Sequence, residues 1–270
     1  MRSIAFVSEK GGVAKTSSVL NVAAVLGGQG SRVLVVDTDP QGNASFVLLK
    51  GEKPRRPSLF DVLVEGDGAD EAIVASHFKG VDVLPADATL ADAAVVLAGE
   101  IGRERRLCAA IEGVADRYDF VLVDTAPTRS LLTTNVLTTV EELIVPFNPG
   151  IFGVLGLGQL QDDVAQVRRY LGNTKLRIAG VVVTLAERNN VCRDLEDQLR
   201  AAFGGLVFDT KVPRSIKIEE AHARHESVIT YAPTSVGATA YKALTREIIN
   251  GRAKDRIVDP GGNPPTDRAA

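Results

Sequence analysis

Short apolar runs alternate along this chain with longer segments that have the residue spacing of helices. Runs of the length of a buried strand occupy residues 4–7, 32–36, 81–85, 119–123, 143–146 and 177–183. Helical segments are expected over residues 16–26, 88–97, 105–114, 131–140, 154–171 and 191–203. Because strands alternate with helices throughout, the pattern predicts an α/β fold with a doubly wound, mostly parallel sheet flanked by helices.

Length and composition fit one large domain. With 270 residues and 45% hydrophobic content, the chain can bury one sizeable core. We expect a single domain over residues 1–250 and a disordered tail over 251–270, which is rich in proline, glycine and charge. The tail lacks the apolar stripe of a membrane-targeting amphipathic helix, so no stable membrane association is expected.

Charge and cysteine content narrow the class of protein. The net charge of -3 gives no overall attraction to nucleic acid, so any DNA binding depends on a local basic patch. Cys108 and Cys192 lack metal-ligand spacing and are expected to be free thiols in a reducing compartment. The first apolar run is too short for a signal peptide or a membrane span, which predicts a cytoplasmic protein.

A glycine-rich segment lies where the first strand turns into the first helix. Backbone N–H groups freed by glycines, together with the positive end of a helix, favour binding of an anion. In phosphate-binding loops, a lysine placed like Lys15 reaches the terminal phosphates and a hydroxyl placed like Thr16 binds Mg²⁺. The residues expected to cradle the phosphates are Gly11, Gly12, Val13, Ala14, Lys15, Thr16 and Ser17. The alternative is a glycine-rich turn without a ligand.

This segment departs from the general phosphate-loop pattern. The two prescribed glycine positions hold Glu9 and Ala14, and an additional Lys10 precedes the glycines. The remaining Lys-Gly-Gly-x-x-Lys-Thr resembles the deviant Walker A loop of the ParA/MinD ATPase superfamily, where Gly is more usual at the position of Ala14. The resemblance implies that Lys10 crosses a nucleotide-sandwich dimer to the phosphates held by the partner subunit.

Two later strands end in carboxylates, which places these groups on the ligand side of an open α/β sheet. Asp124 ends one strand and is a Walker B candidate, since Mg²⁺ prefers few carboxylates and keeps its waters. The segment Asp37 to Asn43 resembles the Asp-x-Asp-Pro-Gln-Gly-Asn motif of the superfamily; a capped turn is the alternative. That resemblance implies that Asp39 orients the attacking water and Asp37 supports the Mg²⁺ shell. After Asp124, residues 128–130 depart from the usual Pro-Ser-Leu-Gly form.

Residues 211–221 resemble a segment of ParA/Soj proteins in which Val-Pro-Arg borders the adenine and the next positions face DNA. The resemblance implies that Val212 and Pro213 form an apolar wall for the base. Arg214 and Lys217 are three residues apart at the expected start of a short helix, where both can face one side and contact phosphates.

Two more arginines, Arg188 and Arg193, are expected to extend this DNA-binding surface in the folded chain. Ordinary surface charge is the alternative, because neighbouring glutamates nearly cancel the local positive excess. His222 and His225 are spaced like metal ligands but lack a matching partner, so an exposed pair is expected instead.

Together, these resemblances cover residues 1–250 and imply a ParA/Soj-type partition ATPase. Such a protein forms a homodimer with ATP and Mg²⁺ and binds non-specific DNA on the nucleoid. A ParB-like partner stimulates its slow hydrolysis, for which Lys10, Lys15 and Asp39 carry the charge and position the water.

Three alternatives stay open. A relative that positions another cargo, such as a carboxysome or a chemotaxis cluster, would have the same motifs. A MinD-like membrane-associated ATPase needs a C-terminal amphipathic helix. A reductase similar to the nitrogenase iron protein needs paired cluster cysteines, which Cys108 and Cys192 do not supply.

Overall fold

The computed structural model describes residues 1–149, 153–187 and 190–250. Within them, eight strands form one sheet in the order β3-β4-β2-β5-β1-β6-β7-β8. The strands are β1 (Arg2–Phe6), β2 (Val33–Asp37), β3 (Val74–Ala75), β4 (Val81–Leu84), β5 (Phe120–Asp124), β6 (Glu142–Phe147), β7 (Arg177–Ala186) and β8 (Val212–Pro213). Neighbouring strands are parallel except for the pair of β3 and β4, which confirms the predicted mostly parallel sheet.

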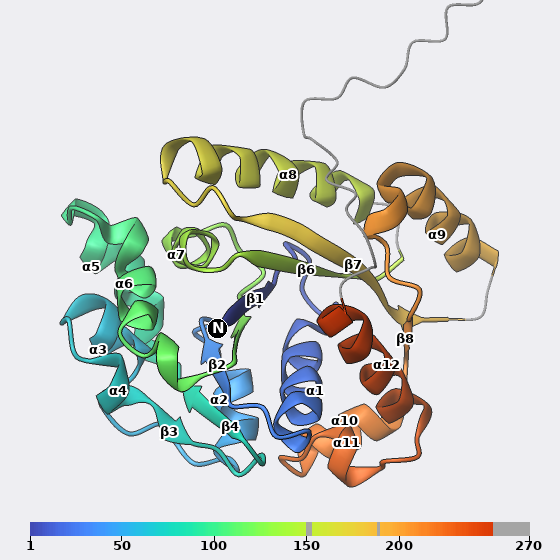
Figure 1. Cartoon of the computed structure of the whole chain (residues 1–270), viewed down its shortest axis with the longest axis horizontal. Coiled ribbons are helices and arrows are strands. Elements are labelled where there is room, and N and C mark those ends of the chain that lie inside the picture. Colours follow the sequence, from blue (N-terminus) through green and yellow to red (C-terminus); the bar gives the residue numbers. More distant parts are fainter. Residues whose placement is uncertain (150–152, 188–189, 251–270) are drawn as a thin grey trace, which may run out of the picture.

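Helices cover both faces of this sheet (Figure 1). One face is covered by α1 (Lys15–Gly28), α2 (Asn43–Leu48), α10 (Ile216–Ala223), α11 (Val228–Tyr231) and α12 (Val236–Asn250). The other is covered by α3 (Leu59–Val64), α4 (Ala69–Ala72), α5 (Ala93–Val96), α6 (Arg106–Glu112), α7 (Leu131–Thr139), α8 (Gly153–Tyr170) and α9 (Asn190–Phe203). The fold is therefore doubly wound, as expected.

The strands contribute apolar side chains to both layers of the core. In β1, Ile4 and Phe6 pack towards α1 and α12, whereas Ala5 packs towards the opposite helices. In β2, Val35 packs towards α1 and α12, and Val36 packs towards the opposite helices. All of these side chains are fully buried. A parallel sheet covered on both faces needs apolar residues at successive positions, which explains the continuous runs in the sequence.

Regular helix is lost in one region where the sequence predicts it. Residues 88–97 form 3₁₀ turns over Ala88–Asp92 and Leu97–Gly99, with only the short α5 between them. The spacing of Leu90, Ala93 and Leu97 still buries these side chains against the sheet layer. Apolar residues three or four positions apart can face the core from an α-helix or from successive 3₁₀ turns. The burial pattern therefore does not by itself distinguish the two.

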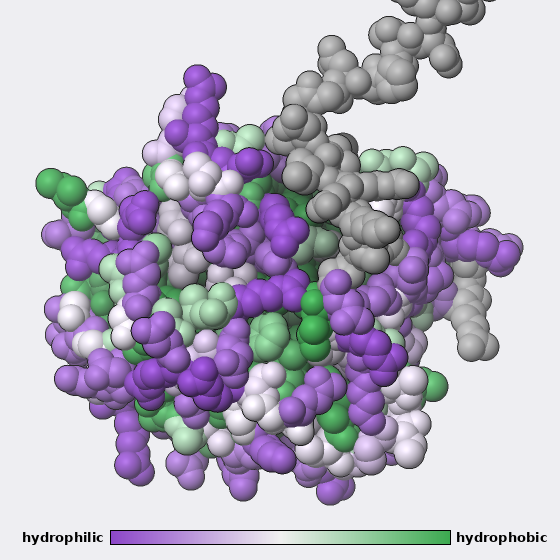
Figure 2. Space-filling model, viewed as in Figure 1, coloured by the Kyte–Doolittle hydropathy of each residue, from purple (hydrophilic) through white to green (hydrophobic). Residues whose placement is uncertain are grey.

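The outer surface is largely polar. The view in Figure 2 shows hydrophilic side chains over most of this face, with smaller apolar areas between them. In the described part of the chain, no helix combines the length and the apolar content needed to cross a membrane. Residues 251–270, for which the sequence predicts disorder, lie outside the described residues.

Candidate functional site

Three strand ends bring the sequence motifs to one edge of the sheet. Strand β5 lies between β1 and β2, and the register places Asp124 beside both Phe6 and Asp37. The glycine-rich loop leaves the end of β1 and enters α1 at Lys15. Motifs more than a hundred residues apart in sequence therefore meet at the carboxyl ends of parallel strands, where α/β proteins bind ligands.

Asp124 provides a buried carboxylate beside the start of α1. Its Oδ2 accepts a 2.7 Å hydrogen bond from Thr16 Oγ1. Its Oδ1 is buried and has no hydrogen-bond partner within the described residues. Burial, and then the nearby charge of Asp37, raises the pKa of Asp124 well above its usual range. A buried carboxylate oxygen without a donor is costly, and a cation beside it would remove that cost.

These residues fit Mg²⁺. Thr16 and Asp124 supply the hydroxyl and carboxylate oxygens that this ion prefers, and Mg²⁺ usually takes its other ligands from water and phosphate. No group of three or more His, Cys, Asp or Glu side chains that could hold a metal occurs in the part of the chain that the structure describes. A Mg²⁺ ion held by Thr16 and Asp124 would take its remaining ligands from a nucleotide and water.

Asp37 is fully buried, and protein donors already occupy its carboxylate. Oδ2 accepts hydrogen bonds of 2.8 Å from the Ser45 N–H and 2.7 Å from the Ser45 hydroxyl, and Oδ1 accepts one of 3.1 Å from the Asp39 N–H. Burial raises the pKa of Asp37 to about 6, although these hydrogen bonds act in the opposite direction. Asp37 thus orders the loop that carries Asp39, and its role in a Mg²⁺ shell stays a prediction.

Asp39 is the more accessible of the two carboxylates in this motif. It is partly exposed, and its Oδ1 accepts a 3.0 Å hydrogen bond from the backbone N–H of Gln41. Its backbone is fixed by Asp37, so the position of the carboxylate is constrained from both sides. This arrangement is suited to orienting a water molecule, the role that the sequence predicts.

Lys15 extends back over the loop that precedes it. Its Nζ donates hydrogen bonds of 3.1 Å to the Ser8 carbonyl and 3.3 Å to the Lys10 carbonyl. Burial lowers the pKa of Lys15, against the opposing effect of the carboxylates Asp124 and Asp39. Lys15 is only 7% exposed, whereas Lys10 is exposed at the loop surface. The cross-dimer role of Lys10 stays a prediction.

Ala14 adopts a backbone conformation that favours glycine. Its φ is 65° and its ψ is 33°, in the left-handed region, immediately before α1. An L-residue with a Cβ atom is less stable in this region than glycine by about 1 kcal/mol. Alanine at position 14, where related loops usually have glycine, therefore destabilises the folded state.

We expect Ala14→Gly to raise the free energy of unfolding by about 0.5–1 kcal/mol, because relief of the left-handed strain exceeds the added freedom of the unfolded chain. Urea unfolding followed by circular dichroism measures this change. Ala24→Gly is the matched control, since Ala24 lies inside the regular helix α1. That control is expected to lose about 1 kcal/mol. If Ala14→Gly lost as much free energy of unfolding as Ala24→Gly, the backbone at Ala14 would not be strained.

Arg129 connects the loop to α8, which the sequence did not indicate. Its Nε lies 2.9 Å from Glu9 Oε1, and its Nη2 contacts the carboxylate of Asp163 in α8. The only signal in the sequence was that residues 128–130 depart from the family pattern. Both partners are distant in sequence, so spacing alone does not identify this bridge.

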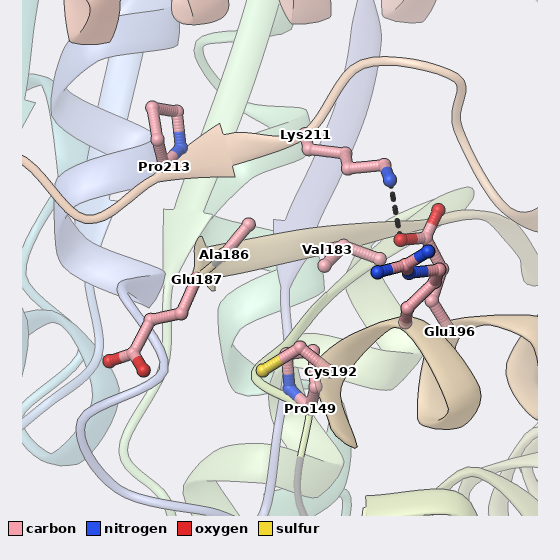
Figure 3. A pocket seen from close by; sticks show the side chains of 9 residues that line it. Pro149, Val183, Ala186, Glu187, Cys192, Glu196, Lys211 and Pro213 are labelled. Carbon is pink, nitrogen blue, oxygen red and sulfur yellow. Dashed lines mark hydrogen bonds and ion pairs between the residues drawn. The ribbon is translucent and has the colours of Figure 1, made fainter. Parts of the chain in front are cut away.

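A cavity of about 510 Å³ lies beyond the ends of β7 and β8, beside α9 (Figure 3). Its lining consists of Pro149, Val183, Ala186, Glu187, Cys192, Arg193, Glu196, Lys211 and Pro213. Lys211 bonds to the nearly buried Glu196 at one side of the cavity. The cavity is large enough for a planar base, and its walls combine apolar and charged side chains.

Only one of the two residues predicted to border the adenine lines this cavity. Pro213 does so, whereas the side chain of Val212 is 1% exposed and packs in the core with α12. Successive residues of a strand point to opposite faces of the sheet, so the two cannot share one wall. The side chain of Val212 therefore faces the core and not this cavity, and the expected contacts of Val212 and Pro213 with a base stay predictions.

The predicted DNA-binding arginines do not form one helical face. Helix α10 begins at Ile216, so Arg214 lies before it and the expectation of a shared helix start is wrong for Arg214. Arg214 lies 3.6 Å from Glu187 in an ion pair. Arg193 lines the cavity and donates a 2.8 Å hydrogen bond to Asn190. Arg188 lies outside the described residues.

The two histidines near the end of α10 are less exposed than expected. His222 lies beside the buried Asn21 of α1, with a separation of 3.5 Å between Nε2 and the Asn21 Nδ2, and burial lowers the pKa of His222 to about 4. The ring of His225 packs edge-on against Phe46, with 4.8 Å between centroids. The expectation of an exposed pair is wrong, because α1 and α2 cover this turn.

This chain is similar to known proteins over most of its length. A family model described as an AAA domain matches residues 1–178. The chromosome partitioning protein ParA of Caulobacter vibrioides is 37% identical over 259 residues, which cover 95% of this chain and 96% of that protein. The sporulation initiation inhibitor protein Soj of Bacillus subtilis is 36% identical over 246 residues, with coverage of 91% and 97%.

A solved structure extends the comparison to a nucleotide complex. Cobyrinic acid a,c-diamide synthase from Mycobacterium smegmatis, crystallised with bound ADP and magnesium, is 31% identical, with a TM-score of 0.79. The match covers 93% of this chain and 94% of that one. From the family model, the relatives and the shared fold, we conclude that the chain belongs to the ParA/MinD-type ATPases, within which ParA and Soj are its relatives.

Proposed function

We propose that this protein dimerises when it binds ATP and Mg²⁺, that the dimer binds non-specific DNA, and that it segregates a plasmid or chromosome with a ParB-like partner. The observation that carries the nucleotide part is the buried Asp124 at the phosphate loop: its Oδ2 bonds to the Thr16 hydroxyl, and its Oδ1 has no hydrogen-bond partner among the described residues. The partition part is supported by the Caulobacter vibrioides relative, which is named a chromosome partitioning protein. The expected location is the cytoplasm, on the nucleoid.

Each residue at the edge of the sheet has a distinct part in this proposal. Lys15 exchanges its backbone carbonyl partners for the terminal phosphates, and Thr16 and Asp124 hold Mg²⁺, which supplies charge neutralisation when bound. Asp39 orients the attacking water, and Asp37 fixes the loop that carries Asp39. Lys10 is exposed, and so it is free to reach a second subunit.

The test is binding of the full chain to random-sequence duplex DNA, compared between ATP and ADP. We expect tight binding only with ATP, and a steep loss of affinity as salt rises, because phosphate contacts release counterions. The double variant Arg214→Ala, Lys217→Ala is expected to dimerise normally and bind DNA weakly. Equal affinity with ATP and ADP would argue against a nucleotide switch, and equal gel shifts for the double variant would reject this surface.

A further inference from the structure

Two side chains of α10 and α11 donate hydrogen bonds to one surface carboxylate, and Arg224, at the end of α10, lies over the ring of one of them. Glu220 Oε2 accepts hydrogen bonds of 2.7 Å from Lys217 Nζ and 2.9 Å from the Tyr231 hydroxyl. Two cations also lie over the Tyr231 ring, with Lys217 Nζ 5.8 Å and Arg224 Cζ 5.4 Å from its centroid. We call Lys217, Arg224 and Tyr231 the α10–α11 cradle.

The cradle favours the ionised form of the carboxylate that it holds. The hydrogen bonds from Lys217 and Tyr231 lower the pKa of Glu220, and the charge of Arg224 acts in the same direction. The pair is accessible to solvent, since the side chains of Lys217 and Glu220 are 53% and 37% exposed. The cradle is thus an open site for an oxyanion, and a side chain of this chain occupies it.

Buried contacts fix the backbone that carries the cradle. Helices α10 and α11 lie side by side below α1 in Figure 1 and pack against each other. The buried Asn21 of α1 accepts a 2.8 Å hydrogen bond from the Val228 N–H, at the first residue of α11. Asn21 also donates a 2.7 Å bond to the Ser17 carbonyl at the start of α1. The cradle is therefore anchored to the helix that follows the phosphate loop.

We propose that the α10–α11 cradle binds a phosphate of the nucleic acid backbone and that Glu220 is an internal competitor for the same donors. The inference rests on the proposed DNA binding and assigns it a regulatory element. A phosphate accepts hydrogen bonds from ammonium, guanidinium and phenol groups as a carboxylate does, and DNA presents many phosphates at high local density. Nucleic acid must displace Glu220, so one subunit alone binds weakly and two cradles in a dimer bind far better.

The competition distinguishes Glu220 from the neighbouring Glu219. Both glutamates lie in α10, and Glu219 is exposed one residue earlier. Replacing either by glutamine removes the same unit of charge from the same helix. Only Glu220 accepts hydrogen bonds from Lys217 and Tyr231. Glu219→Gln is therefore the matched control for the general electrostatic effect.

The experiment measures binding of the full chain with ATP to a labelled random-sequence duplex by fluorescence anisotropy, at about 50 mM salt. We expect Glu220→Gln to bind about three- to tenfold more tightly than the unmodified protein, and Glu219→Gln less than about twofold more tightly. The gain from Glu220→Gln is expected to shrink as salt rises. Adding Arg224→Gln to Glu220→Gln is expected to weaken binding and reduce the salt slope by about one.

The outcomes separate this inference from the proposed function. Equal gains for the two glutamate variants, or no gain for Glu220→Gln, would overturn the competition while ATP-dependent DNA binding by the unmodified protein still stands. An unchanged affinity and salt slope after Arg224→Gln would overturn the cradle as a phosphate site. If neither the unmodified protein nor Glu220→Gln binds DNA with ATP, both the proposed function and this inference fail.

Discussion

Lys15→Ala is expected to lower the affinity for ATP at least about 100-fold, since it removes charge-assisted contacts of about 1.5–3 kcal/mol each to the phosphates. The ammonium of Lys15 is already buried within the loop, where it donates hydrogen bonds to the carbonyls of Ser8 and Lys10. Isothermal titration calorimetry with ATP and Mg²⁺ measures the change. An affinity of Lys15→Ala within about tenfold of that of the unmodified protein would show that the loop does not bind phosphate in this way.

The fold is expected to survive this substitution. Burial already lowers the pKa of Lys15, which means that the folded state disfavours its charge, and the alanine side chain removes that charge. Thermal unfolding without nucleotide therefore serves as the check that lost affinity reflects a lost contact. Lys10→Ala is the matched control, because it removes a lysine from the same loop and is expected to keep ATP affinity.

Lys10→Ala is the variant expected to separate nucleotide binding from dimerisation. The side chain of Lys10 is exposed, and Lys15 bonds to the backbone carbonyl of Lys10, which alanine keeps, so the substitution is expected to preserve the loop within one subunit. We expect ATP to bind with nearly unchanged affinity, and the ATP-dependent dimer to be lost. Light scattering at several protein concentrations, with ATP and with ADP, measures the assembly.

Two results would contradict the proposed role of Lys10. An unchanged dimer with ATP would show that no contact across the interface depends on this lysine. A large loss of ATP affinity would show that Lys10 acts within its own subunit. Lys53→Ala, at an exposed lysine in the polar segment after α2, is the control for a general effect of removing surface charge.

The sequence predicts the fold class and the chemical motifs because both depend on local pattern. Continuous apolar runs such as residues 33–36 predict a sheet that is buried on both faces. Helices do cover both faces of this sheet. Carboxylates that follow such runs, as Asp37 and Asp124 do, must come to the same edge in a parallel sheet. The two-residue strands β3 and β8 were not predicted, because two residues have no detectable period.

Other features depend on which residues from distant segments face one another. Val212 points into the core because β8 is paired with β7 on one side and α12 covers its inner face, although its motif implied contact with a base. The Ser45 hydroxyl donates a hydrogen bond to the carboxylate of Asp37, and Arg129 forms ion pairs with Glu9 and with Asp163 of α8. Each outcome is set by tertiary packing and not by local spacing.

The α/β architecture, the phosphate-loop motif and the order of the carboxylates are predictable from the amino-acid sequence, because periodicity and motif spacing are properties of the local chain. Which charged groups remain available to a ligand depends on the tertiary structure. It pairs Lys217 with Glu220 and Arg214 with Glu187, and it leaves one oxygen of Asp124 buried without a donor among the described residues. Charge interactions fall off with distance and depend on burial, so they are set only once the fold fixes the separation and solvent exposure of each group.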